Sequence, residues 1–122
     1  MKHLLRATRH LILSLFLAAT TAYAGTNTTE SAVKQINGKY VIDVRTEAEW
    51  KAGHVEGAVL IPHDQIKARI TEVTKDTSAP IALYCRSGHR AGLALKTLKE
   101  WGYVNVENLG TLQEARQKLG TP

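Results

Sequence analysis

The chain has 122 residues, of which 43% are hydrophobic and 22% charged, with nine Gly, three Pro and a single Cys. This composition suits one globular domain. It excludes a disordered chain, an intramolecular disulfide framework and a zinc site built from several cysteines. The formal net charge of +5 would indicate an acidic partner if all of it belonged to the folded part.

The first 24 residues have the pattern of a secretory signal peptide. Three basic residues (Lys2, Arg6 and Arg9) precede the apolar run 11–19, and small residues follow as far as Ala24. We expect cleavage after Ala24 and a periplasmic mature protein that does not contact the membrane. An uncleaved anchor is the alternative, but the apolar run is shorter than the roughly 18 residues that span a bilayer.

Three of the five units of net positive charge belong to this segment. Removing residues 1–24 takes three of the 16 basic residues and none of the 11 acidic ones, which leaves a net charge of +2. Such a charge does not support binding of nucleic acid. A small charge and a short chain favour a monomer.

The remaining chain divides into a short leader, residues 25–38, and a folded domain, residues 39–122. In the leader, one or two helical turns are expected over 30–36, ended by Asn37-Gly38. In the domain, apolar and β-branched runs predict strands at 39–45, 58–61, 81–84 and 104–106.

Helical patterns lie between and after these strands. Thr46 and Glu49 are spaced as a capping box and open a short helix through Lys51. Asp64 is expected to cap the next helix, with Ile66 and Ile70 on its apolar face. The remaining helices are expected at 91–101 and 112–119, the former burying Leu93, Leu95 and Leu98. Alternating strands and helices predict an α/β fold, with a small parallel sheet of about four to five strands and helices on both faces.

Ligands of open α/β sheets bind beyond the carboxyl ends of the strands, where Cys85 lies. The loop 85–90 joins a strand to a helix, so its N–H groups can turn inward around an anion. The neighbouring Arg86 and Arg90 favour a thiolate, as a nucleophile requires. The alternative is a Cys85 that only fills space in the core.

The length of this loop bears on the reaction. Phosphatases with a cysteine nucleophile use C-x5-R, whereas here Arg90 is the sixth residue counted from Cys85. A shorter loop makes a tighter N–H nest, which suits the outer sulfur of a persulfide better than a tetrahedral oxyanion. The spacing therefore disfavours a phosphatase or an arsenate reductase.

Two motifs make the sequence similar to the rhodanese family of sulfurtransferases. Residues 42–58 resemble the D-x-R…E-[FYW]-x-x-G-H-[IV]-x-G-A pattern of that family, and residues 85–90 resemble its C-x-x-G-x-R loop. With the closing stretch 107–110, the resemblance covers roughly residues 40–120. Glu56 and Thr111 depart from the usual Pro and Gly and are interpreted as loop variants, and the short amino-terminal segment implies a reduced sheet.

The resemblance implies transfer of a sulfane sulfur without a metal or an organic cofactor. Cys85 would take the outer sulfur of a small donor such as thiosulfate, release sulfite and hold a persulfide, and cyanide or a thiol would then accept the sulfur. The loop residues expected to bind substrate are Arg86, Ser87, Gly88, His89 and Arg90.

Three residues of the first motif are expected to support this site. Asp43 and Arg45 end a strand at the same edge of the sheet as Cys85, and Arg45 is expected to pair with Glu49 one helical turn away. His54 is interpreted as a structural hydrogen-bonding residue rather than a catalytic base.

Two other functions are compatible with a single reactive thiol. One is a sulfur-carrier or binding module that presents the persulfide to a partner with little free turnover. The other is a redox-sensing thiol, which the absence of a second, resolving cysteine disfavours.

Overall fold

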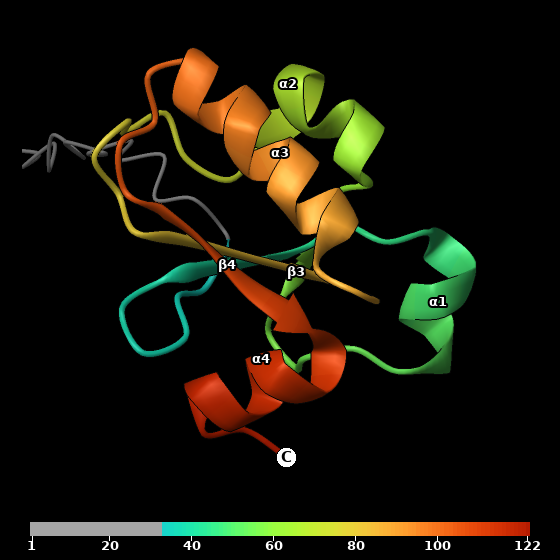
Figure 1. Ribbon diagram of the computed structural model, residues 1–122. Helices are drawn as coiled ribbons and strands as arrows, with labels where there is room; N and C mark the ends of the chain where they lie inside the picture. Colours follow the sequence, from blue (N-terminus) through green and yellow to red (C-terminus); the bar gives the residue numbers. More distant parts are fainter. Residues whose placement is uncertain (1–32) are drawn as a thin grey trace, which may run out of the picture.

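The computed structural model describes residues 33–122, so the expected signal peptide and most of the leader lie outside the described residues. Ten elements follow one another (Figure 1): β1 (Tyr40–Asp43), α1 (Glu47–Ala52), β2 (Val59–Leu60), η1 (His63–Gln65), α2 (Ile66–Arg69), η2 (Ile70–Glu72), β3 (Ile81–Cys85), α3 (His89–Glu100), β4 (Val106–Thr111) and α4 (Leu112–Leu119). None of the helices in this part of the chain is long and apolar enough to cross a membrane.

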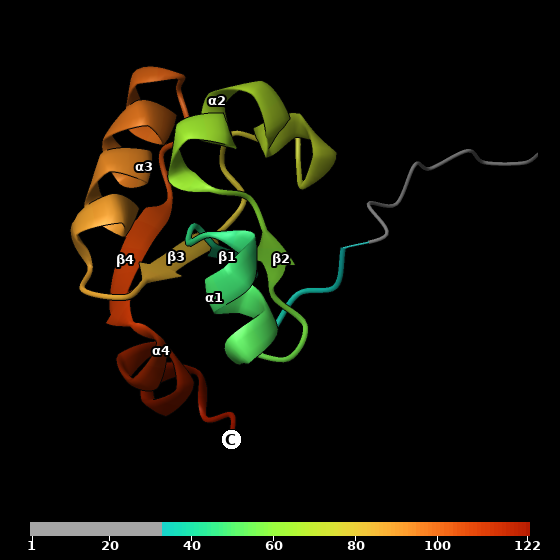
Figure 2. The ribbon, with the colours of Figure 1, turned by 90° about the vertical axis from the view of Figure 1, so that its right-hand side faces the viewer.

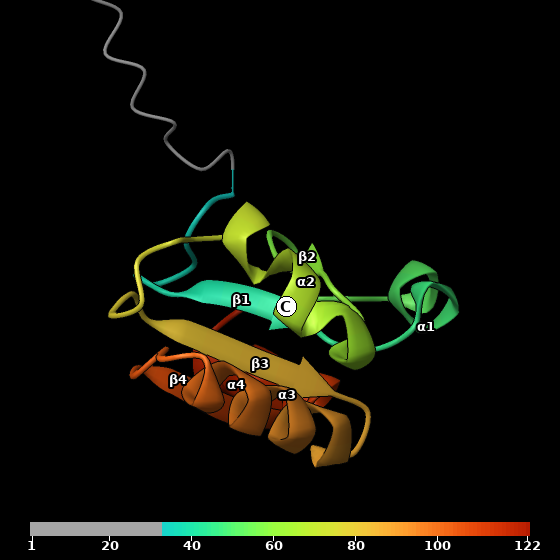
Figure 3. The ribbon, with the colours of Figure 1, turned by 90° about the horizontal axis from the view of Figure 1, so that it is seen from above.

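The four strands form one parallel sheet in the order β2-β1-β3-β4, which confirms the predicted fold class. Figure 3 shows β1 and β3 pointing toward the end of the sheet where α1 lies. The carboxyl ends of the strands therefore gather the residues that follow β1, β3 and β4 at one edge. Ligand sites of such sheets form at this edge.

Helices cover both faces of the sheet, as the alternating pattern predicts (Figure 2). One buried cluster lies beneath α2 and α3 and includes Ile42, Leu83 and Cys85. A second cluster lies beneath α4 and includes Tyr84 and Leu119. Neighbouring residues of β3 thus face opposite cores, which is why its five residues are all buried and read as a continuous apolar run.

The expected helical turns over 30–36 are wrong in their described part, residues 33–36. This segment is not helical, and Ile36 exchanges two backbone hydrogen bonds with Lys39 across a tight turn. Asn37 and Gly38 fill the turn with φ of 50° and 78°, the left-handed conformation that an Asn-Gly pair adopts easily.

The segment from 63 to 72 is less regular than expected. It is a short α-helix between two 3-10 turns, and the side chain of Asp64 caps none of them. Ile66 and Ile70 are buried as predicted. The apolar spacing thus identifies the buried face correctly but does not reveal the change in helical type.

Two further expectations are corrected by the packing of α3 and β4. Leu93 is 45% exposed, because α3 turns Ala91, Ala94 and Leu98 toward the sheet instead. The fourth strand spans 106–111 rather than 104–106, and Val104 is 74% exposed.

The pairing of β4 with β3 contains an extra residue. Leu83 pairs with Asn108, but Cys85 pairs with Thr111, so β4 uses one more residue than β3 over this interval. Gly110 lies within the bulge at φ 91°. The bulge places Thr111 beside Cys85 at the carboxyl edge.

Two of the helices that begin at this edge, α1 and α4, start with a capping box. The predicted box of Thr46 and Glu49 is confirmed at α1. A second box joins Thr111 to Glu114 at α4, so Thr111 is a helix cap rather than a loop variant. Its T-x-x-E spacing was readable in the sequence.

Candidate active site

Cys85 is the last residue of β3 and is buried. Its Sγ accepts hydrogen bonds from two backbone N–H groups, those of Gly88 at 2.9 Å and Ala91 at 3.4 Å. These donors belong to the loop that follows the strand, called the Cys85 loop here (residues 85–91). The sulfur therefore lies in a small nest of N–H groups that stabilises negative charge on it.

Gly88 gives the Cys85 loop its shape. It has φ 90° and is the N-cap of α3, a conformation that a residue with a Cβ rarely adopts. Its carbonyl oxygen accepts from the N–H of Gly92 and from Nδ2 of Asn108, both at 2.9 Å. Asn108 therefore fastens the loop to β4. Sequence reasoning missed this role, although Asn108 lies in the closing stretch 107–110.

Arg90 is held by Glu49 of α1. Its Nη1 and Nη2 lie 2.7 and 2.9 Å from the two carboxylate oxygens. The hydrogen bonds from Arg90 lower the pKa of Glu49 to about 2. The expected pair of Arg45 with Glu49 is thus wrong: the carboxylate at helical spacing is taken by an arginine 41 residues further along the chain.

Arg45 pairs with Asp43 instead. The Asp43 carboxylate accepts from Nε, Nη2 and the backbone N–H of Arg45, and Nη2 also donates to the Gly53 carbonyl at 2.7 Å. Both side chains are buried, and hydrogen bonding to Asp43 raises the pKa of Arg45. The pair fixes the loop between β1 and α1 over the phenol ring of Tyr84.

His54 lies beside the same loop. Its ring stacks on Trp50, with centroids 3.5 Å apart and planes 6° from parallel. Its Nδ1 lies 2.8 Å from the carbonyl oxygen of Trp50, to which it donates in the tautomer with a proton there. These contacts hold the end of α1, and they occupy the side of the ring that bears Nδ1.

The other loop residues point to solvent. Arg86, Ser87 and His89 are exposed, and the Ser87 hydroxyl accepts from the His89 backbone N–H at 3.5 Å. The structure thus brings the N–H groups of Gly88 and Ala91 to the sulfur, while Arg86 is exposed and lies among the residues that line a neighbouring hollow.

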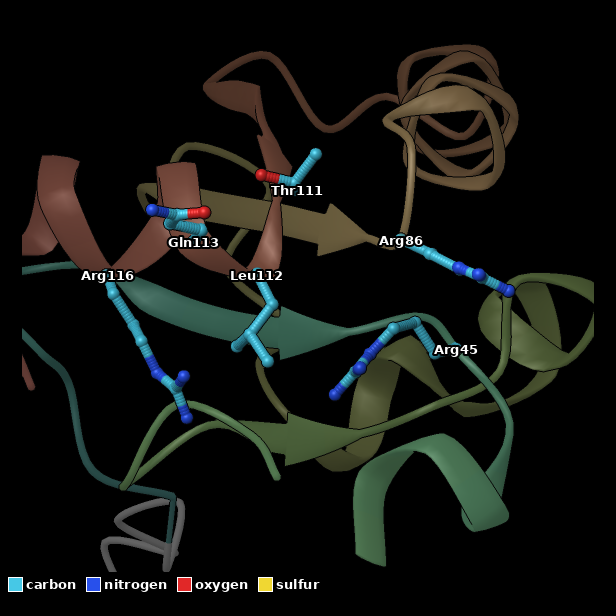
Figure 4. A pocket seen from close by; sticks show the side chains of 6 residues that line it. All are labelled: Arg45, Arg86, Thr111, Leu112, Gln113 and Arg116. Carbon is cyan, nitrogen blue, oxygen red and sulfur yellow. The ribbon is translucent and has the colours of Figure 1, made fainter. Parts of the chain in front are cut away.

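This hollow, called the arginine pocket here, has a volume of about 640 Å³ (Figure 4). It opens at the carboxyl edge of the sheet, beside the strand pair of Cys85 and Thr111. Its lining residues come from the loops after β1 and β3 and from the start of α4: Arg45, Arg86, Thr111, Leu112, Gln113 and Arg116. Arg116 gave no signal in the sequence beyond lying one helical turn after Leu112.

Over residues 33–122, no three His, Cys, Asp or Glu side chains are grouped so as to hold a metal ion. Two backbone N–H groups face the sulfur, and three arginines line the pocket. They favour anions.

Comparison with known proteins gives matches over most of the chain. The rhodanese-like domain model matches residues 28–111. Thiosulfate sulfurtransferase PspE of Escherichia coli is 38% identical over 60% of this chain and 70% of its own length. A sulfurtransferase of Allochromatium vinosum is 37% identical over 65% of this chain and 74% of its own. A solved structure, a rhodanese with anions from E. coli, superimposes with a TM-score of 0.61 at 37% identity, covering 62% of this chain and 89% of that one.

Proposed function

Because this chain belongs to the rhodanese family of sulfurtransferases, we propose that it is a thiosulfate sulfurtransferase that carries the transferred sulfur as a persulfide on Cys85. The observation that carries the proposal is the position of the Cys85 sulfur. It lies at the carboxyl end of β3 and accepts the N–H groups of Gly88 and Ala91. Similarity to a thiosulfate sulfurtransferase supports the choice of donor.

The first step transfers the outer sulfur of thiosulfate. The Cys85 thiolate attacks that sulfur, a new S–S bond forms, and the bond to the sulfonate group breaks with its electron pair. Sulfite leaves, and Cys85 becomes a persulfide anion. The total charge is the same before and after, so no oxidant or reductant takes part.

The second step returns the enzyme to its starting state. A nucleophile attacks the outer sulfur of the persulfide, and the Cys85 thiolate leaves. With cyanide the product is thiocyanate, and with a thiolate it is a new persulfide. Because the thiolate is both nucleophile and leaving group, hydrogen bonds to its sulfur help the second step as well as the resting state.

Arg86 and Arg90 have different roles in this mechanism. Arg90 is occupied by Glu49 and fixes the start of α3. Arg86 is exposed, and within residues 33–122 no hydrogen bond or ion pair engages its guanidinium. We therefore assign attraction of the anionic donor to Arg86, and positioning of the loop to Arg90.

The test is a comparison of the protein with its Cys85→Ser variant. Thiosulfate should add one sulfur atom, about 32 Da by intact mass, to the parent protein only. Cyanide should then remove that sulfur and yield thiocyanate at steady state. Loading without turnover would point to the sulfur-carrier function. Absence of both loading and turnover would reject the proposal.

We also propose that the enzyme works in the periplasm after cleavage following Ala24. The support is the basic, apolar and small-residue order of residues 1–24. Expression of the full chain in a Gram-negative host, followed by fractionation and N-terminal sequencing, tests it. A mature protein in the periplasmic fraction that begins at Gly25 is expected, whereas an intact Met1 in the cytoplasm would contradict the proposal.

A further inference from the structure

Cys85 is inaccessible to substrates in this conformation. The exposed fraction of the residue is 0%, although a nucleophile must touch the atom that it attacks. The N–H groups of Gly88 and Ala91 occupy one side of the sulfur and belong to the site itself. A neighbouring element must therefore move before Sγ can meet a donor or an acceptor.

Among the α-helices, α1 is attached least firmly. Figure 3 shows α1 beyond the carboxyl ends of β1 and β3, clear of the helices that cover the two faces of the sheet. All six residues of α1 lie in the described part of the chain, and none of them is buried. By contrast, α2, α3 and α4 each bury at least one residue. Local opening costs least where few apolar contacts are lost, so α1 can move while the sheet stays folded.

The pair of Glu49 with Arg90 holds α1 beside the Cys85 loop. Within residues 33–122, it is the only hydrogen-bonded or ionic contact that joins α1 to another helix or strand. Hydrogen bonding to Glu49 is the main cause that raises the pKa of Arg90, and the charge of Cys85 adds to it. The pair therefore lies within electrostatic reach of the sulfur.

Both ends of the α1 segment are anchored. Arg45, which precedes it, is buried. After it, the Gly53 carbonyl accepts from Nη2 of Arg45 at 2.7 Å, and the His54 carbonyl accepts from Nη2 of Arg116 at 3.3 Å. The C-cap Gly53 has φ 148°, which glycine adopts more readily than other residues. Anchored ends on either side of a weakly attached helix are the arrangement of a hinged flap.

We propose that α1 and its N-cap form a flap, called the α1 flap here (residues 46–52), and that Glu49 keeps it closed through Arg90. When the ion pair separates, the flap turns about Thr46 and Gly53, and Sγ of Cys85 becomes accessible. When the pair forms again, the sulfur is shielded. Glu49 is thus a positioning residue for both steps of sulfur transfer. The inference rests on the proposed function, because both steps require access to Sγ.

The test measures how fast a neutral reagent reaches Cys85. Iodoacetamide alkylates thiolates, carries no charge that an arginine could attract, and has a single cysteine to react with in this chain. Glu49→Gln should raise the alkylation rate about fivefold, as expected for loss of a partly exposed ion pair. Glu49→Asp keeps the charge and should lie between the two. Rates are compared at the pH-independent plateau, so that differences in thiolate content do not contribute.

A matched control removes the same charge from the same helix. Glu47 pairs only with Lys51, also on α1, so Glu47→Gln should leave the alkylation rate unchanged. The rates are also measured at low concentrations of urea. Opening of a short helix exposes little surface and should depend weakly on urea. Global unfolding would give the steep dependence of the equilibrium transition.

The outcomes separate the α1 flap from the function on which it rests. If thiosulfate loads no sulfur while Glu49→Gln still accelerates alkylation, the proposed function fails and control of access by Glu49 stands. If sulfur is loaded but Glu49→Gln is alkylated at the parent rate, Glu49 does not control access and the inference is overturned. A faster rate with the urea dependence of global unfolding overturns it as well, because lost stability then explains the effect.

Discussion

Glu49 and Arg90 join the first helix to the start of the helix that follows the reactive cysteine. Both nitrogens of the Arg90 fork meet both oxygens of Glu49, and each side chain is about one quarter exposed, at 24% and 27%. The N–H of the next residue, Ala91, donates to the Cys85 sulfur. The ion pair therefore holds α1 and the Cys85 loop together.

We expect Glu49→Gln to weaken this connection. The loss of a two-point, partly exposed ion pair should lower the free energy of unfolding by about 1 kcal/mol at pH 7, measured by urea denaturation. Glu47 provides the control, because it pairs with Lys51 where both side chains are 72% exposed. Glu47→Gln should change stability little. Equal losses in the two variants would mean that the Arg90 contact has no special role.

The same pair predicts a pH dependence. In the folded protein the pKa of Glu49 is about 2, below its ordinary value of 4.5, because Arg90 donates hydrogen bonds to the carboxylate. The stabilisation is therefore complete above pH 4.5 and is lost as the pH falls toward 2. The difference in unfolding free energy between the parent and Glu49→Gln should shrink over this window. A difference that stays constant down to pH 2 would contradict the prediction.

Asn108 should act on the rate of sulfur loading through Gly88. Asn108→Ala removes the donor to the Gly88 carbonyl and the acceptor for the Gly110 N–H, and should cost about 1 kcal/mol of stability. Asn108→Asp keeps the acceptor alone. Both variants should load sulfur from thiosulfate more slowly in a rapid-quench mass assay, whereas Asn105→Ala, at an exposed position before β4, should not. Normal loading in Asn108→Asp would assign Asn108 a purely structural role.

Gly88→Ala tests the left-handed N-cap beside the sulfur. A Cβ there would make only an ordinary contact of 3.6 Å with Gly110, so the cost comes from φ 90°. We expect a loss of about 1–2 kcal/mol and a fall of about tenfold or more in the loading rate, because the N–H that faces Cys85 moves. Gly120→Ala, at φ 67° in open space, should lose stability without a change in that rate. A slower rate in both variants would attribute the effect to stability.

Breaking the buried pair of Asp43 and Arg45 should be the costliest change. Asp43→Asn leaves a buried guanidinium without its counter-charge and should lower the free energy of unfolding by about 3 kcal/mol. The double variant Asp43→Asn, Arg45→Met also lacks the guanidinium charge and should recover part of the lost free energy of unfolding. The measurement is urea denaturation of the single and double variants. A double variant that is less stable by the sum of two independent losses would argue against coupling.

Local patterns in the sequence predict much of this fold. The continuous apolar run before Cys85 identifies the central strand, and the spacing of Thr46 and Glu49 identifies the start of α1. Leu93 shows where such patterns fail. Three leucines suggest an apolar face, but only Leu98 is fully buried, together with Ala91 and Ala94, and Leu93 is exposed. Which face of α3 meets the sheet is a property of the assembled layers and is not visible in one helix.

Part of the candidate site could likewise be predicted from the sequence, and part could not. The sequence predicts Cys85 and its loop as the site, because they lie directly after the end of a strand. The partners of Arg90, Gly88 and Arg45 could not be predicted, because each depends on which of several possible partners the fold brings close. The helical spacing of Arg45 and Glu49 suggested a local pair, yet the carboxylate of Asp43 is buried beside Arg45 and takes it. Burial decides the competition, and burial is known only from the fold.

The extra residue of β4 sets the rotational phase of the last helix. An α-helix turns about 100° per residue, so removing Gly110 to restore regular pairing with β3 would begin α4 one residue early and rotate it by that angle. Ala115 and Leu119 would then leave the core beneath α4. Arg116 would leave the wall of the pocket as well. One residue at the end of a strand thus governs which side of α4 faces the reactive edge of the sheet.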